Sequence, residues 1–188
     1  MSEMPLKNAI LITIFLFSAT LVAGWISTAQ NPEMGESLMQ LFENEIAGQL
    51  KTSDPYSMSV NLFVNNLEAC ILLFLGGATF GILTLFIMSL NGIVIGAIME
   101  IIHHDHSVTF IAAAILPHGI FEIPAFILAG ALGIMLAHSL VSEWYGRADA
   151  VGDANRFARI FVMYVLPLVA IAATVEAFIT PAIIRLVV

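Results

Sequence analysis

A histidine and a glutamate four residues apart, His118 and Glu122, lie inside a long apolar stretch of the sequence. On a helix, residues at this spacing stack on one face, so the two side chains would point the same way. An imidazole and a carboxylate placed in this way can relay a proton, bind a cation or supply two ligands to a metal ion. A simpler interpretation is a charge-assisted hydrogen bond that satisfies backbone groups freed by Pro117. The spacing alone leaves these interpretations open.

Three further glutamates, Glu68, Glu100 and Glu176, lie within or near apolar runs. An ionised, unpaired carboxylate near the middle of a bilayer is costly, so such groups usually face a bundle interior or a wet cavity. No lysine or arginine lies at comparable depth, so the expected partners are histidine, asparagine, threonine, a bound cation or the glutamates' own protons. We predict one buried polar cluster with five members: Asn65, Glu68, His118, Glu122 and Glu176.

A second group of metal-ligand residue types is the run His103, His104, Asp105 and His106. Adjacent side chains rarely converge on one ion, so a polar turn at the membrane edge is the favoured interpretation. The sequence contains no H-E-x-x-H, G-x-S-x-G or G-x-x-x-x-G-K motif. We therefore expect a protein that is not an enzyme, with an intramembrane metal-dependent hydrolase as the last alternative.

The composition indicates which kind of fold positions these residues. Of the 188 residues, 60% are hydrophobic and only 11% are charged. A water-soluble core of this size could not hide so much apolar surface, so the remainder must face lipid. The length allows one membrane domain of about five or six spans. The predicted fold is thus an all-α, polytopic membrane helix bundle. A net charge of −8 argues against a nucleic-acid partner.

The first apolar run extends from Ala9 to Ser27, long enough to cross the bilayer, although a short basic start also allows a cleavable signal peptide. A second helix is predicted from Ser59 to Leu90, with Asn65 and Glu68 on one face and an end at the turn signal Asn91-Gly92. The last span is expected from Ile160 to about Ile184.

Between these spans the apolar runs are short, because Ile93–Ile102 and Val108–Leu116 each cover about half a membrane. Only the run from Ile120 to Val141 is again long enough to cross. This pattern predicts at least one discontinuous or re-entrant helix, which is tolerated at membrane depth where protein or a wet cavity surrounds it. A short tilted span followed by a long kinked one is the alternative, so the topology between Gly92 and Gly119 stays open.

Charge sets the expected orientation. The loop of about residues 29–58 is acidic, contains an amphipathic pattern from Leu38 to Leu50 and is predicted to lie outside. The loop of about residues 142–159 carries Arg147, Arg156 and Arg159 and is predicted to be cytoplasmic. We expect a multi-pass cell-membrane protein with a cytoplasmic N-terminus.

Four glycines occur in pairs four residues apart, a spacing that lets helix backbones approach closely within one subunit or between two. The pairs are Gly77 with Gly81 and Gly92 with Gly96. We expect them to pack helices and to support a homo-oligomer, in the first place a homodimer.

The stretch Leu116–Ala125 resembles the stage II sporulation protein M family, as do the pairs Asn65-Asn66 and Asn91-Gly92 and the segment Glu176–Pro181. The resemblance covers roughly residues 8–185. It implies a membrane protein of the same fold. The name-giving member of the family works in engulfment during sporulation beside peptidoglycan-degrading partners, whereas relatives in non-sporulating organisms, including archaea, generally have no assigned role.

Two functions follow as expectations. The first is a non-enzymatic membrane protein whose polar cluster binds or conducts a proton or cation, with His118 and Glu122 as the candidate ligands if that cation is a metal. The second, implied by the resemblance, is a membrane scaffold that recruits envelope protein partners. In both, the surrounding partner is the lipid bilayer.

Overall fold

The computed structural model describes residues 4–31, 33, 54–105 and 108–186, and this part of the chain is helical without a β-strand. Within these described residues, five helical segments are long and apolar enough to cross a membrane. They are Leu6–Gln30, Pro55–Thr79, Ile82–His103, Ala112–Trp144 and Ala150–Phe178. The predicted all-α, multi-span fold is therefore confirmed. The amphipathic helix predicted between Leu38 and Leu50 lies outside the described residues.

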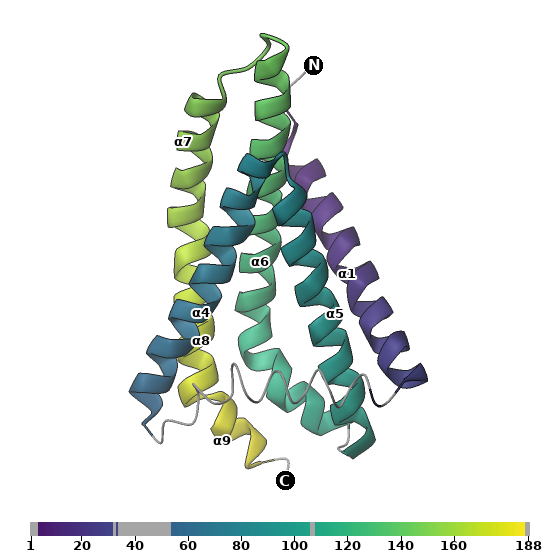
Figure 1. The fold of residues 1–188 in the computed structure, drawn as a ribbon. Coiled ribbons are helices and arrows are strands. Elements are labelled where there is room, and N and C mark those ends of the chain that lie inside the picture. Colours follow the sequence, from purple (N-terminus) through teal and green to yellow (C-terminus); the bar gives the residue numbers. More distant parts are fainter. Residues whose placement is uncertain (1–3, 32, 34–53, 106–107, 187–188) are drawn as a thin grey trace.

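The five segments run alternately up and down, as Figure 1 shows. The N-terminus and the connection between α6 and α7 lie at one end, and the C-terminus lies at the other. The element bounds are α1 Leu6–Gln30, α4 Pro55–Leu75, the 3-10 helix η2 Gly76–Thr79, α5 Ile82–Asp105, α6 Val108–Trp144, α7 Ala150–Ile160, the π-helix η3 Phe161–Val165, α8 Leu166–Phe178 and α9 Thr180–Ile184.

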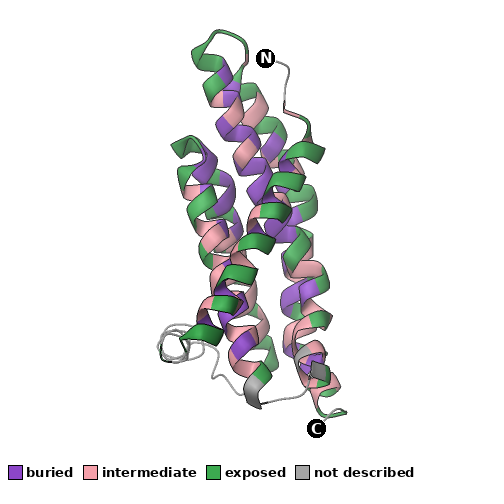
Figure 2. Ribbon diagram, turned by 90° about the vertical axis from the view of Figure 1, so that its right-hand side faces the viewer, coloured by how far each residue is buried: buried purple, intermediate pink, exposed green. Residues whose placement is uncertain are grey.

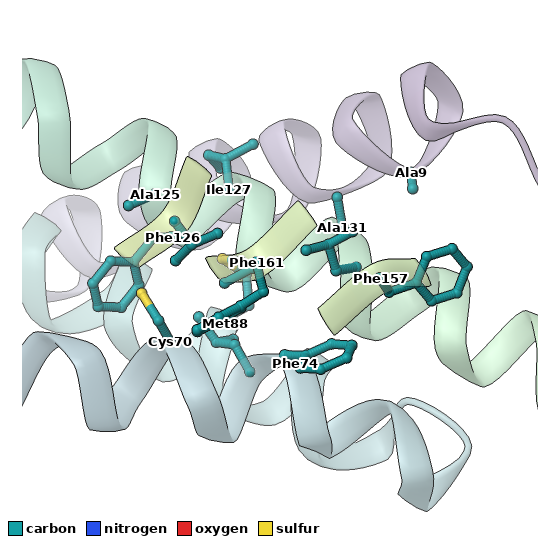
Figure 3. Close-up of a cluster of buried hydrophobic side chains, with 14 of the residues drawn as sticks. Ala9, Cys70, Phe74, Met88, Ala125, Phe126, Ile127, Ala131, Phe157 and Phe161 are labelled. Carbon is teal, nitrogen blue, oxygen red and sulfur yellow. The ribbon is translucent and has the colours of Figure 1, made fainter. Parts of the chain in front are cut away.

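Helix α6 lies at the centre and packs against α1, α4, α5, α7, α8 and α9. The side chains around it form the core, in which Leu132 and Val169 are completely buried and the rings of Phe74 and Phe161 stack 5.7 Å apart (Figure 3). Large apolar side chains such as Phe15 and Ile82, by contrast, are exposed. Exposed residues run along each helix of the bundle (Figure 2). An apolar exterior around a packed interior is the arrangement of a bundle surrounded by lipid.

The turn predicted at Asn91-Gly92 is wrong, because α5 continues through both residues. The chain instead reverses at Phe80-Gly81, where φ is 53° and 84°. Asn91 is accommodated in the helix because its amide nitrogen donates to the Ile87 carbonyl at 2.9 Å. Gly92 serves packing, since a Cβ there would collide with the hydroxyl of Thr20 on α1.

A re-entrant helix is not confirmed, because α5 and α6 are continuous helices of 24 and 37 residues. Helix α6 passes through Pro117 and Pro124 without a break, and its first turns lie at an angle to the rest (Figure 1). The expected alternative of a kinked long helix therefore describes this region. The run Val108–Leu116 looks short because Pro117 and His118 follow it, although α6 continues through both and His118 lines the cavity inside the bundle.

The predicted cytoplasmic loop of residues 142–159 is largely helical. Only Tyr145–Asp149 separates α6 from α7. The side chain of Asp149 caps α7 by accepting from the Gly152 amide at 3.0 Å, and Glu143 accepts from the Ala150 amide at 3.2 Å. With its N-terminal amides satisfied in this way, α7 starts before the apolar run and continues into the last span.

The predicted helix-packing glycines act within the chain. A Cβ on Gly92 or Gly96 would collide with α1, and one on Gly77 would collide with the Gly133 carbonyl on α6. Gly81 supplies the positive φ of the α4–α5 turn. These contacts account for all four glycines inside one subunit, so the predicted homodimer draws no support from them and stays a prediction.

Candidate functional site

A cavity of about 590 Å³ lies among α4, α5, α6 and α8, within the segments that are long enough to span a membrane. Part of its wall is apolar, as expected for such helices. Its polar wall residues are Asn65, Asn66, Glu68, Asn91, His118, Glu122 and Glu176. Of the residues that the structure describes, no lysine or arginine belongs to the wall, which carries three carboxylates and a single imidazole.

The N-terminal cap of α4 fixes where the helix begins and therefore which residues share its polar face. Asp54 caps it by accepting from the Ser57 amide at 3.1 Å and from the Ser57 hydroxyl at 2.9 Å, and Pro55 occupies the first helical position. These hydrogen bonds, the Ser57 amide first, lower the pKa of the Asp54 carboxyl below its ordinary value. Asn65 and Glu68, three residues apart, then share the face that lines the cavity.

His118 on α6 connects two carboxylates. Its Nδ1 contacts Glu176 Oε2 of α8, and its Nε2 lies 3.9 Å from Glu122 Oε2, one turn along α6. All three side chains are about one-fifth to one-quarter exposed. The sequence-predicted pair is thus completed by a third residue, 58 positions from His118 by the sequence numbering, that only the packing of α6 against α8 brings into contact.

The arrangement of Glu122, His118 and Glu176 bears directly on its chemistry. The two carboxylates face the two different nitrogens of one ring, which point away from each other. Three ligands placed in this way do not surround one ion, and no group of three potential metal ligands occurs among the residues that the structure describes. Imidazole can, however, accept a proton at one nitrogen and release it at the other. The geometry therefore suits a proton relay better than a metal site.

The structure brings all five residues of the predicted cluster to one cavity: Asn65, Glu68, His118, Glu122 and Glu176. Glu100 does not join them, because it is buried elsewhere on α5. His103 lies at the end of α5 with its ring edge-on to Trp25, 5.7 Å between centroids. The side chains of His104 and Asp105, and all of His106, lie outside the described part of the chain.

Sequence reasoning missed Asn66 and Asn91 as wall residues. Asn91 was assigned to a turn because Asn-Gly pairs favour turns. The informative signal was its spacing from the apolar residues Ile87 and Ile95, each four positions away, which continues one helical face through the pair. Asn66 adjoins Asn65 and carries no periodic signal of its own.

The fold and the cavity define a class, an α-helical multi-pass membrane protein with a polar cavity among its spans. A sequence model of the stage II sporulation protein M family matches residues 13–181. The chain therefore belongs to this family.

Among curated proteins, the chain is similar to two uncharacterized proteins of Methanocaldococcus jannaschii. It is 26% identical to MJ0793 over 180 residues, which cover 94% of this chain and 96% of that protein. It is also 26% identical to MJ0706 over 141 residues, which cover 72% of this chain and 62% of the relative. No solved structure matches the chain significantly.

Proposed function

We propose that this protein is a non-enzymatic membrane protein that binds and conducts a proton at Glu122, His118 and Glu176. The observation that carries the proposal is the contact of one imidazole with two carboxylates from two different helices, at the wall of a cavity within the membrane spans. Ionisable groups at this depth are costly unless they are paired, and they commonly mark proton or ion paths.

The net charge of Glu122, His118 and Glu176 favours the uptake of a proton. With both carboxylates ionised and His118 protonated, the three groups carry a net charge of −1, and no described lysine or arginine lies in the cavity wall. One additional proton makes the cluster neutral and removes the cost of a buried net charge. His118 contacts Glu176 at Nδ1, and its Nε2 lies 3.9 Å from Glu122, a gap that one water molecule or a small side-chain movement closes. With that gap closed, a proton passes from one carboxylate to the other through the ring.

The charges at the two ends support an orientation. Lys7, Arg147, Arg156 and Arg159 belong to the end that holds the N-terminus and the α6–α7 connection, whereas Arg185 follows α9 at the other end. Basic residues concentrate on the cytoplasmic side of membrane proteins. We place the protein in the cell membrane with its N-terminus in the cytoplasm and its C-terminus outside.

The proposal is tested by proton uptake into liposomes that contain the purified protein and a trapped pH-sensitive dye. A potassium gradient with valinomycin supplies an inside-negative potential, and the rate of internal acidification is measured. We expect wild-type protein to acidify the lumen faster than protein-free liposomes and Glu176→Gln to abolish the difference, since glutamine cannot accept a proton.

Glu100→Gln is the matched control, because it removes a carboxylate from a membrane span without touching the cavity. It should retain the wild-type flux. Equal rates for the wild type and Glu176→Gln, or a wild-type rate equal to that of empty liposomes, would reject proton conduction. The scaffold of an envelope-associated complex would then become the better proposal, since the family name refers to sporulation.

A further inference from the structure

The side of the cavity formed by α4 and α5 contains acceptors that the Glu122–His118–Glu176 cluster does not use. Within the described part of the chain, the side chains of Asn65, Asn66 and Glu68 make no hydrogen bond or ion pair. Asn91 donates its amide nitrogen to the Ile87 carbonyl at 2.9 Å. Because a carbonyl only accepts, this bond fixes the orientation of the amide and leaves the Asn91 side-chain oxygen as an acceptor.

These side chains can bind a partner that the described part of the chain does not supply. A polar side chain without a hydrogen bond in apolar surroundings costs several kcal/mol, and Asn65, Asn66 and Glu68 belong to a helix inside an apolar span. Among the described residues, three carboxylates and no lysine or arginine line the wall, and His118 faces two of the carboxylates. The third carboxylate, on Glu68, has no counter-charge from the residues that the structure describes. A ligand that satisfies this side of the cavity is therefore positively charged and donates several hydrogen bonds.

The volume of the cavity and its apolar wall residues indicate what the ligand carries besides the charged group. A volume of about 590 Å³ is far larger than a bare ion and falls within the range typical of small-molecule pockets. The apolar part of the wall consists of aliphatic and aromatic side chains: Leu62, Leu72, Val94, Ile95, Ile98 and Phe126. These side chains suit a hydrocarbon body attached to the charged group.

We propose that the cavity binds a primary ammonium group that carries a short hydrocarbon chain. The three N–H donors of the ammonium group face the Glu68 carboxylate and amide oxygens of the neighbouring asparagines, and the hydrocarbon lies against the apolar wall. This inference goes beyond proton conduction, and neither requires the other. Glu68 is exposed on the spanning helix α4, so the same chemistry can arrive as a free amine or as the headgroup of an ethanolamine lipid.

The test uses full-length protein in phosphatidylcholine nanodiscs, with pentylammonium as the probe and calorimetric titration as the readout. Empty nanodiscs correct for partition into lipid. We expect saturable binding of pentylammonium and at least tenfold weaker binding of pentanol and pentanoate, which have the same hydrocarbon without the positive charge. Equal affinity for the three compounds would overturn the proposal.

Two variants localise the binding. Glu68→Gln should raise the Kd for pentylammonium at least tenfold, and Asn66→Leu should raise it without any change of charge, so the test survives if one variant does not fold. Glu100→Gln, outside the cavity, should bind as the wild type does. An unchanged Kd in both cavity variants would contradict the assignment.

Changing the lipid composition of the nanodiscs distinguishes a lipid headgroup from a free amine as the source of the ammonium group. If added phosphatidylethanolamine raises the apparent Kd for pentylammonium in the wild type, the ligand is a lipid headgroup; if it does not, the ligand is a free amine. Both results support an ammonium site. Because the proton assay depends on Glu176→Gln and the amine assay on Glu68→Gln, either proposal can fail while the other stands.

Discussion

The two halves of the bundle pack in different ways. Around the α4–α5 turn, Gly77 of the turn lies against the Gly133 carbonyl, and Gly133 of α6 lies against the Leu73 carbonyl. Toward the other end, the same helices carry Glu68 and Glu122 where they face one another, and a cavity of about 590 Å³ separates them. Glycine lets backbones meet, whereas long polar side chains hold them apart. One pair of helices thus provides both a rigid, close-packed end and a cavity.

The polar side chains of the two halves also differ in whether they form hydrogen bonds. In the packed half, the buried hydroxyl of Thr84 donates to the Leu73 carbonyl at 2.8 Å. In the cavity half, Asn65, Asn66 and Glu68 have no partner within the described chain. The packed half is therefore expected to determine stability, and the cavity half to determine binding. Two predictions test this division, and a third concerns the helix cap at Asp54 outside the spans; they follow in order of decreasing effect.

The largest effect is expected for Gly133→Val. A Cβ at this position would collide with the Leu73 backbone carbonyl, which cannot move without displacing α4. We expect a loss of at least about 3 kcal/mol of unfolding free energy, the upper end of overpacking costs. Cys70 is the single cysteine and is fully buried, so a maleimide dye reacts with it only when the protein unfolds. The measurement is the temperature at which this reaction occurs.

Gly119→Ala is the matched control on the same helix, at the cavity end. A Cβ there would meet the side chains of Ile115 and Ile123 at 3.6 and 3.7 Å, which is ordinary contact. Alanine has the better helix propensity by about 1 kcal/mol, so this variant should be as stable as the wild type or more stable. If both glycine variants lost stability equally, the division into a packed and an open half would be wrong.

An intermediate effect is expected for Thr84→Val, which keeps the shape of the side chain but removes the donor to the Leu73 carbonyl. The loss should be about 1–2 kcal/mol, because a buried hydrogen bond disappears. Asn66→Leu in the cavity half should leave stability unchanged or raise it, since no bond within the described chain is lost. The same dye assay compares the two, and a greater loss in Asn66→Leu would contradict the comparison.

The smallest effect is expected at Asp54, outside the spans. The Ser57 amide and hydroxyl stabilise the ionised carboxyl only in the folded chain, so its pKa is lower when folded than when unfolded. Its contribution to stability is therefore complete above the ordinary aspartate pKa and is lost as the pH falls through the folded value. Asp54→Asn keeps a capping acceptor that does not titrate.

Thermal unfolding followed by circular dichroism, from neutral pH down to about pH 3, would measure this contribution. The melting temperature of the wild type should fall with pH more steeply than that of Asp54→Asn in the acidic range. Parallel curves for the two proteins would show that the cap at Asp54 does not contribute to the pH dependence of folding.

The sequence by itself determined the class of fold and indicated five of the polar residues that line the cavity. Apolar runs such as Ala9–Ser27 must face lipid, and carboxylates such as Glu122 and Glu176 cannot, so the bundle interior was the only place left for them. These conclusions depend on composition and local spacing alone. They agree with the five spans and with the position of the cluster residues at one cavity.

Only the tertiary structure decided where helices end and which groups touch. Asn91-Gly92 has the composition of a turn, but close packing of Gly92 on Thr20 keeps α5 continuous. Pro117 has the signature of a break, but α6 continues through it. The contact between His118 and Glu176 joins residues far apart in the chain, so no local pattern specifies it. Packing between helices overrides such local signals because it supplies most of the stability of each helix.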